Sequence, residues 1–318
     1  MAAFSTVTNK YIAKQNRHNT SFTNTNPICI YSTIQVILIL CWFIYYVSQN
    51  IPGPGCSMDD FEQKLCGCHC QICGSDCKCT ESYGTAYMDN KILPEFLEFS
   101  VKPVFECNSN CVCSQKCHNR LVQHGITVKL QIITTDNKGL GLETLEKIPR
   151  GTFVCEYAGE IISQEEARNR IKLQTESDMN YILTVKEHCK SGIIKTNVDP
   201  NKFGNIGRYI NHSCEPNLAM VPVRVETMVP KICLFALRDI EPMEELTFQY
   251  GAPTSKKSGK LCCCSSDSCT GFLRNKDNGF NKWRKDRQTE TQTNSKTIPY
   301  PLAGHNKIKS LRHKIALK

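Results

Sequence analysis

The chain has 318 residues, which is enough for one or two domains with a sizeable core. Its net charge of +9 is uneven, because residues 276–318 hold 11 Lys and Arg against 3 Asp and Glu and therefore carry +8. Residues 1–275 carry only about +1, which excludes a strongly basic nucleic-acid-binding surface over the main part of the chain.

The 21 cysteines are an odd number in a long chain, which argues against the disulfide framework of a small secreted protein. Cys66 and Cys68, like Cys77 and Cys79, are separated by one residue and are too close to pair without strain. Clustered thiols at such spacings indicate thiolates bound to zinc, and hence a reducing compartment. If thirteen thiolates bind four Zn²⁺ ions, residues 1–275 carry about −4, which suits a basic substrate such as a lysine-rich peptide.

Residues 1–49 are an atypical N-terminal segment with an uncharged, mostly apolar run at 28–47. The run is long enough for a transmembrane helix, and three basic residues before it would favour a cytoplasmic N-terminus. Polar side chains within the run weaken a membrane span, and no clear cleavage site marks a signal peptide. A wrong gene model that includes translated intron or leader is the alternative, and the sequence leaves both open. We do not expect the protein to bind a membrane, although the apolar run at 28–47 does not exclude it.

Residues 50–120 form a cysteine-rich region that begins at "NIPGPGC", residues 50–56. Two dense clusters lie in it, and the second has the metal-site spacing C-x₃-C-x-C-x₃-C. Nine thiolates fill the twelve positions of three four-coordinate zinc ions if three of them bridge, which would make the cluster closed and structural. Separate mononuclear sites with spare thiols are the alternative. The nine expected ligands are Cys68, Cys70, Cys73, Cys77, Cys79, Cys107, Cys111, Cys113 and Cys117, with Cys66 as a substitute for Cys68 or Cys70.

Residues 121–252 are expected to form many short strands separated by Gly and Pro turns, a mainly β fold without parallel βαβ units. Strand-like segments lie at 128–135, 151–162, 180–185, 231–237 and 245–250. One short helix is predicted at 163–174, with Ser163 as its N-cap. Cys155, Cys189 and Cys233 lie within apolar strands and are expected to be core thiols.

A third cysteine group, Cys262, Cys264 and Cys269, supplies three of the four ligands that a closed zinc site needs. Cys214, in "GRYINHSCEPN" at 207–217, is the expected fourth ligand. Cys214 is therefore predicted to be a ligand and not a nucleophile. A thiol hydrolase built on Cys214 and His212 would lack an orienting third residue.

Residues 276–318 are polar and basic, and we predict that they are disordered. They could contact nucleic acid non-specifically through phosphates, but the expectation is a solvated, unstructured end.

The cysteine clusters, "NHSCEPN", "ELTFQY" and the terminal C-x-C-x₄-C follow one another in a fixed order over residues 50–275. This order resembles the SET-domain protein lysine methyltransferases that carry a pre-SET zinc cluster and a post-SET zinc loop. The resemblance implies a SET fold of small curved β-sheets, in which "NHSC" threads through a loop closed by "ELTFQY" as a pseudoknot. It also implies a pre-SET region at 50–120, a SET catalytic domain at 121–252 and a post-SET loop at 260–275.

The same resemblance implies a cofactor, S-adenosylmethionine, and a histone tail as substrate, with histone H3 or the nucleosome as partner in the nucleus, on the chromosome. Tyr250 is implied as the catalytic tyrosine, Tyr157 as a lining residue of the lysine channel, and Phe248 as a residue that leaves room for at least two methyl groups. The implied cofactor contacts are the backbone of Lys138, Gly139, Leu140 and Gly141, together with Tyr181, Arg208, Asn211 and His212.

Two positions depart from the family pattern. Gln249 stands where an aspartate is usual, and Leu140 stands where a tryptophan is frequent. Gln249 and the atypical N-terminal segment keep a second hypothesis open, a catalytically weak zinc-stabilised module that binds chromatin.

Overall fold

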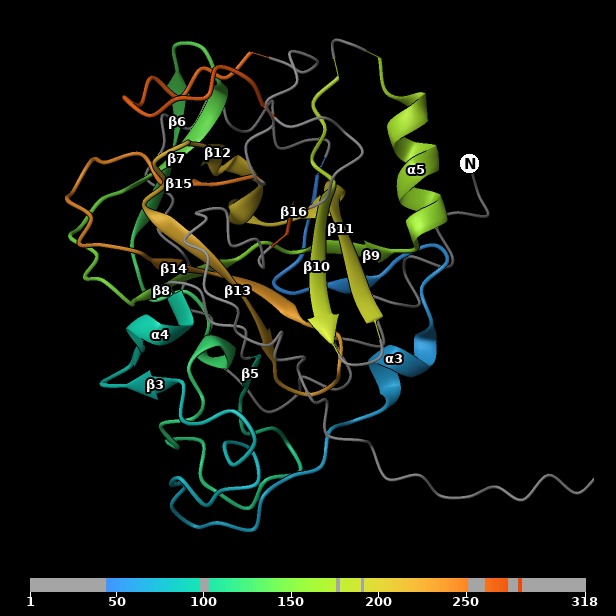
Figure 1. The fold of residues 1–318 in the computed structure, drawn as a ribbon, viewed down its shortest axis with the longest axis vertical. Coiled ribbons are helices and arrows are strands. Elements are labelled where there is room, and N and C mark those ends of the chain that lie inside the picture. The colour runs from blue at the N-terminus through green and yellow to red at the C-terminus, as the bar shows by residue number, and fades with distance from the viewer. Residues whose placement is uncertain are drawn as a thin grey trace, which may run out of the picture. The chain divides into compact units, whose positions relative to one another are not determined.

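The computed structural model describes residues 44–97, 103–175, 178–189, 192–250, 261–273 and 280–281. These residues form a mainly β fold of two six-stranded sheets and two two-stranded sheets (Figure 1). The mainly β fold expected from the sequence is confirmed.

The first six-stranded sheet runs in the order β16-β10-β11-β9-β2, with β1 added to β11. Its long hairpin, β10 and β11, is antiparallel, whereas β1, β2 and β16 join as short parallel strands. The strands are β1 (Tyr45–Tyr46), β2 (Ile51–Pro52), β9 (Gly159–Ile162), β10 (Leu183–Cys189), β11 (Gly192–Gly204) and β16 (Phe280–Asn281).

The second six-stranded sheet runs in the order β12-β15-β13-β14-β8, with β5 added to β13. The strands are β5 (Val104–Phe105), β8 (Phe153–Glu156), β12 (Asn211–His212), β13 (Leu218–Arg224), β14 (Lys231–Ala236) and β15 (Thr247–Phe248). The two-stranded sheets are formed by β3 (Tyr87–Met88) with β4 (Lys91–Ile92), and by β6 (Leu130–Thr135) with β7 (Gly139–Thr144).

Helices are short in the described part of the chain. They are α3 (Met58–Glu62), α4 (Pro94–Leu97), α5 (Gln164–Leu173), and the 3₁₀ turns η2 (Val122–His124) and η3 (Ile206–Tyr209). The predicted helix at 163–174 is α5, which lies beside β11 (Figure 1). Its N-cap Ser163 Oγ accepts a hydrogen bond from the Glu166 N–H at 3.0 Å and so satisfies one free donor of the first turn.

The main core lies between the two large sheets and includes Leu142, Val198, Leu234 and Phe248, all nearly inaccessible to solvent. Cys155 and Cys233 are fully buried, and burial raises the pKa of both thiols, so they remain neutral core groups as expected. Cys189 lies on β10, where its side chain is not among those described.

The last residues of the apolar run at 28–47 are not helical. Tyr45 and Tyr46 form β1 and pair in parallel with β11, and the Tyr45 ring stacks on Phe203 with centroids 5.1 Å apart. Residues 28–43 lie outside the described residues. Among the helices that the structure describes, none is sufficiently long and apolar to span a bilayer.

The predicted disordered tail contains one described element. Phe280 and Asn281 form β16, which pairs in parallel with Val185 and Lys186 of β10. The edge of β10 offers backbone partners to these two residues, and the disorder of residues 276–318 stays a prediction. The rest of residues 276–318 lies outside the described residues.

Residues 245–250 pass between two segments that are far apart in the sequence. On one side Leu246 donates its N–H to the Leu142 carbonyl at 2.7 Å, next to the bridge between Glu143 and Glu245. On the other side β15 pairs in parallel with β12, and Ser213 donates its N–H to the Phe248 carbonyl at 3.2 Å. The "NHSC" and "ELTFQY" segments therefore meet in the crossed arrangement that the SET resemblance implies.

Candidate functional site

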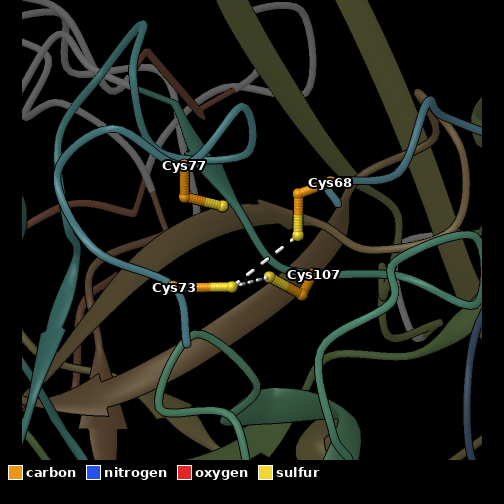
Figure 2. A group of neighbouring side chains, drawn as sticks. All are labelled: Cys68, Cys73, Cys77 and Cys107. Atoms are coloured by element: carbon orange, nitrogen blue, oxygen red, sulfur yellow. Dashed lines mark hydrogen bonds between the residues drawn. The ribbon is translucent and has the colours of Figure 1, made fainter. Parts of the chain in front are cut away.

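The cysteine-rich region brings its sulfur atoms together in a buried cluster. In Figure 2 the side chains of Cys68, Cys73, Cys77 and Cys107 point toward one another. The Sγ atoms of Cys68 and Cys73 are 3.7 Å apart, and those of Cys73 and Cys107 are 3.6 Å apart. A disulfide would hold the sulfurs at about 2.05 Å, whereas tetrahedral Zn–S bonds of about 2.3 Å place them roughly 3.8 Å apart. The spacing fits zinc.

The cluster resolves into three overlapping groups of four sulfurs, with all sulfurs of a group within 4.8 Å of one another. The groups are Cys68, Cys73, Cys77 and Cys107; Cys68, Cys79, Cys107 and Cys111; and Cys73, Cys107, Cys113 and Cys117. Cys107 belongs to all three groups, and Cys68 and Cys73 belong to two each. Eight of the nine predicted ligands are thus brought together. The ninth, Cys70, is partly buried and packs against the cluster, whereas Cys66 is exposed.

Hydrogen-bond donors surround these sulfurs. The N–H groups of Cys68 and Asn108 point at Cys111 Sγ, at 3.3 and 3.2 Å. Arg120, only 4% exposed, donates from Nη2 to the Asn108 carbonyl at 2.9 Å and to Cys113 Sγ at 3.6 Å. Nine thiolates on three Zn²⁺ ions would carry a charge of about −3, which these dipoles and the guanidinium would partly offset.

The predicted post-SET ligands also come together. Cys214, Cys262, Cys264 and Cys269 have sulfurs within 4.8 Å of one another, and Cys214 and Cys262 are 4.0 Å apart. Cys263 is exposed and is not in the group. The four thiols join the "NHSC" segment to the C-terminal segment, as ligand counting anticipated.

Three aromatic rings adjoin the crossed segments. The Phe248 ring lies between Tyr250 and Tyr157, with centroid distances of 4.8 and 6.0 Å. The Tyr157 hydroxyl donates to the Tyr181 carbonyl at 2.6 Å, and the Tyr250 hydroxyl donates to the Ile210 carbonyl at 2.8 Å. Burial raises the pKa of both phenols, so both remain protonated donors at neutral pH.

The predicted cofactor residues gather beside this aromatic group. Asn211 Nδ2 donates to the Leu140 carbonyl at 3.1 Å and to Glu245 Oε1 at 3.0 Å. Gly141 faces both side chains, since an added Cβ would lie 3.2 Å from Asn211 Nδ2 and 3.0 Å from Glu245 Oε1. Gly139 has φ = 74°, the left-handed region that favours glycine. The glycine at 141 therefore lets the strand pack closely against these side chains, and Lys138 pairs with Glu245.

Two further predicted cofactor residues are fixed by their neighbours. The Arg208 guanidinium carbon lies 4.1 Å above the Tyr181 ring, and its Nε donates to the Pro200 carbonyl at 3.2 Å. His212 Nδ1 accepts from the Tyr250 N–H at 3.1 Å. Burial, with a smaller contribution from the Lys138 charge, lowers the pKa of His212 to about 4, so its ring is neutral at pH 7.

Sequence reasoning missed three polar residues that support the site. Asn217 donates from Nδ2 to the Glu245 carbonyl and accepts at Oδ1 from the Thr247 N–H, both at 2.8 Å, and so fixes the crossing. Glu245 contacts Asn211 and Lys138, and Asn205 caps η3 through Gly207 N–H at 3.0 Å. Two asparagines in the sequence could have indicated these contacts: Asn217, directly after the proline of "CEPN", and Asn205, directly before "IGRY".

Comparison with known families agrees with this geometry. The SET domain family matches residues 139–251, and the Pre-SET motif matches residues 20–120. The chain belongs to the SET-domain family of histone-lysine N-methyltransferases.

Individual relatives place it more closely. The chain is 45% identical over 247 residues to the histone-lysine N-methyltransferase SETMAR of Mus musculus, an alignment that covers 72% of this chain and 80% of the relative. The crystal structure of the methyltransferase domain of human SETMAR superposes with a TM-score of 0.66 and 40% identity, covering 75% of this chain and 90% of that one. KRYPTONITE, solved with mCHH DNA, an H3(1-15) peptide and SAH, has a TM-score of 0.58 and 27% identity, and the match covers 74% of this chain and 48% of that one.

Proposed function

We propose that this protein is an S-adenosylmethionine-dependent protein lysine N-methyltransferase that acts on a histone tail, with histone H3 as the substrate, and that it works on chromatin in the nucleus. The observation that carries the proposal is the juxtaposition of Tyr157, Phe248 and Tyr250 with Asn211 beside the backbone of Gly139–Gly141. The SAH and H3 peptide bound by KRYPTONITE support the choice of cofactor and substrate.

Bound S-adenosylmethionine supplies a methyl group on a positively charged sulfur, which a lysine amine can accept. The amine must be neutral to attack, whereas free lysine has a pKa of about 10.4. The buried rings of Phe248 and Tyr157, with the Tyr250 ring packed on Phe248, disfavour an ammonium ion beside them, which lowers the lysine pKa. Neither phenol is required as a base.

The two tyrosines orient the amine. Each hydroxyl is held by a main-chain carbonyl, at Tyr181 for Tyr157 and at Ile210 for Tyr250, so each oxygen keeps lone pairs for an approaching N–H. Holding the amine in a near-attack geometry converts a bimolecular step into an effectively unimolecular one. Phe248 carries no hydroxyl that could anchor a water molecule, which leaves room for at least two methyl groups on the product.

The zinc ligands are proposed in the same way. In a cluster of three zinc ions and nine thiolates, each ion has two bridging and two terminal ligands. Cys68, Cys73 and Cys107 are the shared sulfurs and therefore the bridges. The ion bound by Cys68, Cys73 and Cys77 then lacks one terminal ligand, and we assign Cys70, which packs against the cluster. A fourth ion is assigned to Cys214, Cys262, Cys264 and Cys269.

Mass spectrometry of nucleosomes incubated with S-adenosylmethionine tests the function. The wild-type protein is expected to produce dimethylated lysine on H3, and Tyr250→Phe is expected to lose at least about 100-fold in kcat because one oriented contact to the amine is removed. Tyr83→Phe is the matched control, since the buried Tyr83 hydroxyl has no hydrogen-bond partner among the described residues. Equal activity of wild type and Tyr250→Phe would refute the role of Tyr250.

The alternative, a weak zinc-stabilised chromatin-binding module, is favoured by Gln249 at a position where the family usually has aspartate. Calorimetry separates the two functions. A protein that binds an H3 peptide but neither binds S-adenosylmethionine nor transfers its methyl group has the second function.

A further inference from the structure

The residues between β8 and β9 leave one large sheet and enter the other. β8 pairs with β14 in the second sheet, whereas β9 pairs with β11 and β2 in the first. Tyr157 and Ala158 form the connection. Main-chain N–H groups at such a crossover have no regular ladder and must find other acceptors.

Three successive N–H groups at this crossover donate to three different acceptors, one main-chain carbonyl and two asparagine side chains. Tyr157 N–H donates to the Ile232 carbonyl at 2.7 Å, which is the last contact of the strand type. Ala158 N–H donates to Asn205 Oδ1 at 3.3 Å, and Gly159 N–H donates to Asn50 Oδ1 at 3.1 Å. Two asparagine side chains therefore replace the missing sheet partners.

Asn50 reaches this connection from a separate part of the chain. It lies between β1 and β2, which join the first sheet at β11 and β9. Its Nδ2 donates to the Pro230 carbonyl at 3.2 Å, and its main-chain N–H donates to Glu156 Oε1 at 3.3 Å. The side chain thus ties the start of β9 to Pro230, the residue before β14, which is the strand that accepts the Tyr157 N–H at Ile232.

We propose that Asn50 is a positioning residue for Tyr157, an inference that rests on the methyltransferase function proposed above. Gly159 lies two residues after Tyr157 and has no free space, because an added Cβ would lie 2.6 Å from the Asp199 carbonyl oxygen. With the Asn50 contact in place, the backbone holds the Tyr157 hydroxyl on the Tyr181 carbonyl and the ring against Phe248. Without it, the crossover gains freedom, and the amine loses part of its orientation.

Steady-state kinetics on an H3 peptide test this role. Asn50→Ala is expected to lower kcat about 10-fold, while KM for the peptide and the Kd for S-adenosylmethionine stay within about twofold, because only the orientation of one phenol changes. Gln49→Ala is the matched control: Gln49 is exposed and accepts from Lys231 Nζ at 3.3 Å, and its loss is expected to leave kcat within about twofold. The proposal would be overturned if KM for the peptide or the Kd for S-adenosylmethionine rose by a factor as large as the loss in kcat.

A double variant separates positioning from a general structural role. In a Tyr157→Phe background, Asn50→Ala is expected to lower kcat less than about threefold, since a residue that acts through Tyr157 is not additive with it. Equal losses in both backgrounds would overturn the proposal.

Hydrogen exchange tests the contact without any activity. Asn50→Ala should increase amide exchange in a peptide that spans 157–160 and leave exchange in β14 unchanged. Unchanged exchange at 157–160 would overturn the proposal. If the wild-type protein transferred no methyl groups, the proposed function would fail, and the exchange measurement would still decide whether Asn50 restrains the crossover.

Discussion

A buried ion pair joins the two large sheets and gives a sharp stability prediction. Arg224 on β13 donates from Nη1 and Nη2 to the two carboxylate oxygens of Glu187 on β10, at 3.0 and 2.8 Å. The side chains are 1% and 3% exposed, so neither charge is solvated by bulk water. Arg224→Met would leave the Glu187 carboxylate buried without its guanidinium.

Loss of one partner of a buried pair costs about 3–5 kcal/mol in unfolding free energy, most of it from the charge left uncompensated. If the unfolding free energy falls by about 4 kcal/mol, the melting temperature of a folded unit of roughly 150–250 residues falls by roughly 8–16 °C. Removal of both charges avoids that penalty. The double variant Arg224→Met with Glu187→Leu should therefore recover more than half of the loss.

Thermal unfolding followed by circular dichroism, with zinc present throughout, measures these differences. Arg238→Met is the control, because the Arg238 side chain is 55% exposed in its pair with Glu244, and its loss should cost less than about 1 kcal/mol. The reasoning is refuted if Arg224→Met costs no more than Arg238→Met, or if the double variant is less stable than Arg224→Met alone.

The remaining predictions concern the site. Phe248→Tyr should shift the products toward monomethyllysine, because the added hydroxyl can anchor water where a methyl group would lie; unchanged product ratios in mass spectrometry would contradict this. Gly141→Ala should weaken S-adenosylmethionine binding at least about 10-fold in calorimetry, since the new Cβ would lie 2.8 Å from Thr135 Cγ2 and 3.0 Å from Glu245 Oε1 and would force the strand away from Asn211; an unchanged Kd would show that this packing does not shape the cofactor site. Metal analysis should find four zinc ions per chain, and three in Cys214→Ser; a wild-type content below three would reject the shared-sulfur cluster.

Local patterns in the sequence were enough for several features. Alternating apolar residues and turn signals indicated short strands, and Ser163 marked the start of α5 because an N-cap is decided within one helical turn. The C-x₃-C-x-C-x₃-C spacing indicated metal, and ligand counting pointed to Cys214 as the partner of three cysteines about fifty residues away. In each case the deciding residues are close in sequence, or their number follows from the four ligands that a closed zinc site needs.

Tertiary structure alone decided which sulfurs are shared and which asparagines support the site. Six cysteines between Cys66 and Cys79 look alike in sequence, yet Cys68 and Cys73 are central, Cys70 is peripheral and Cys66 is exposed. Asn50 contacts Gly159, which is 109 positions away, and Asn217 contacts Glu245 and Thr247, which are 28 and 30 positions away. These segments meet only when the two sheets form. Spacing along the chain fixes which groups can bind a metal or cap a helix, but burial and long-range contact depend on the packing of the whole fold, and these select the residues that act together.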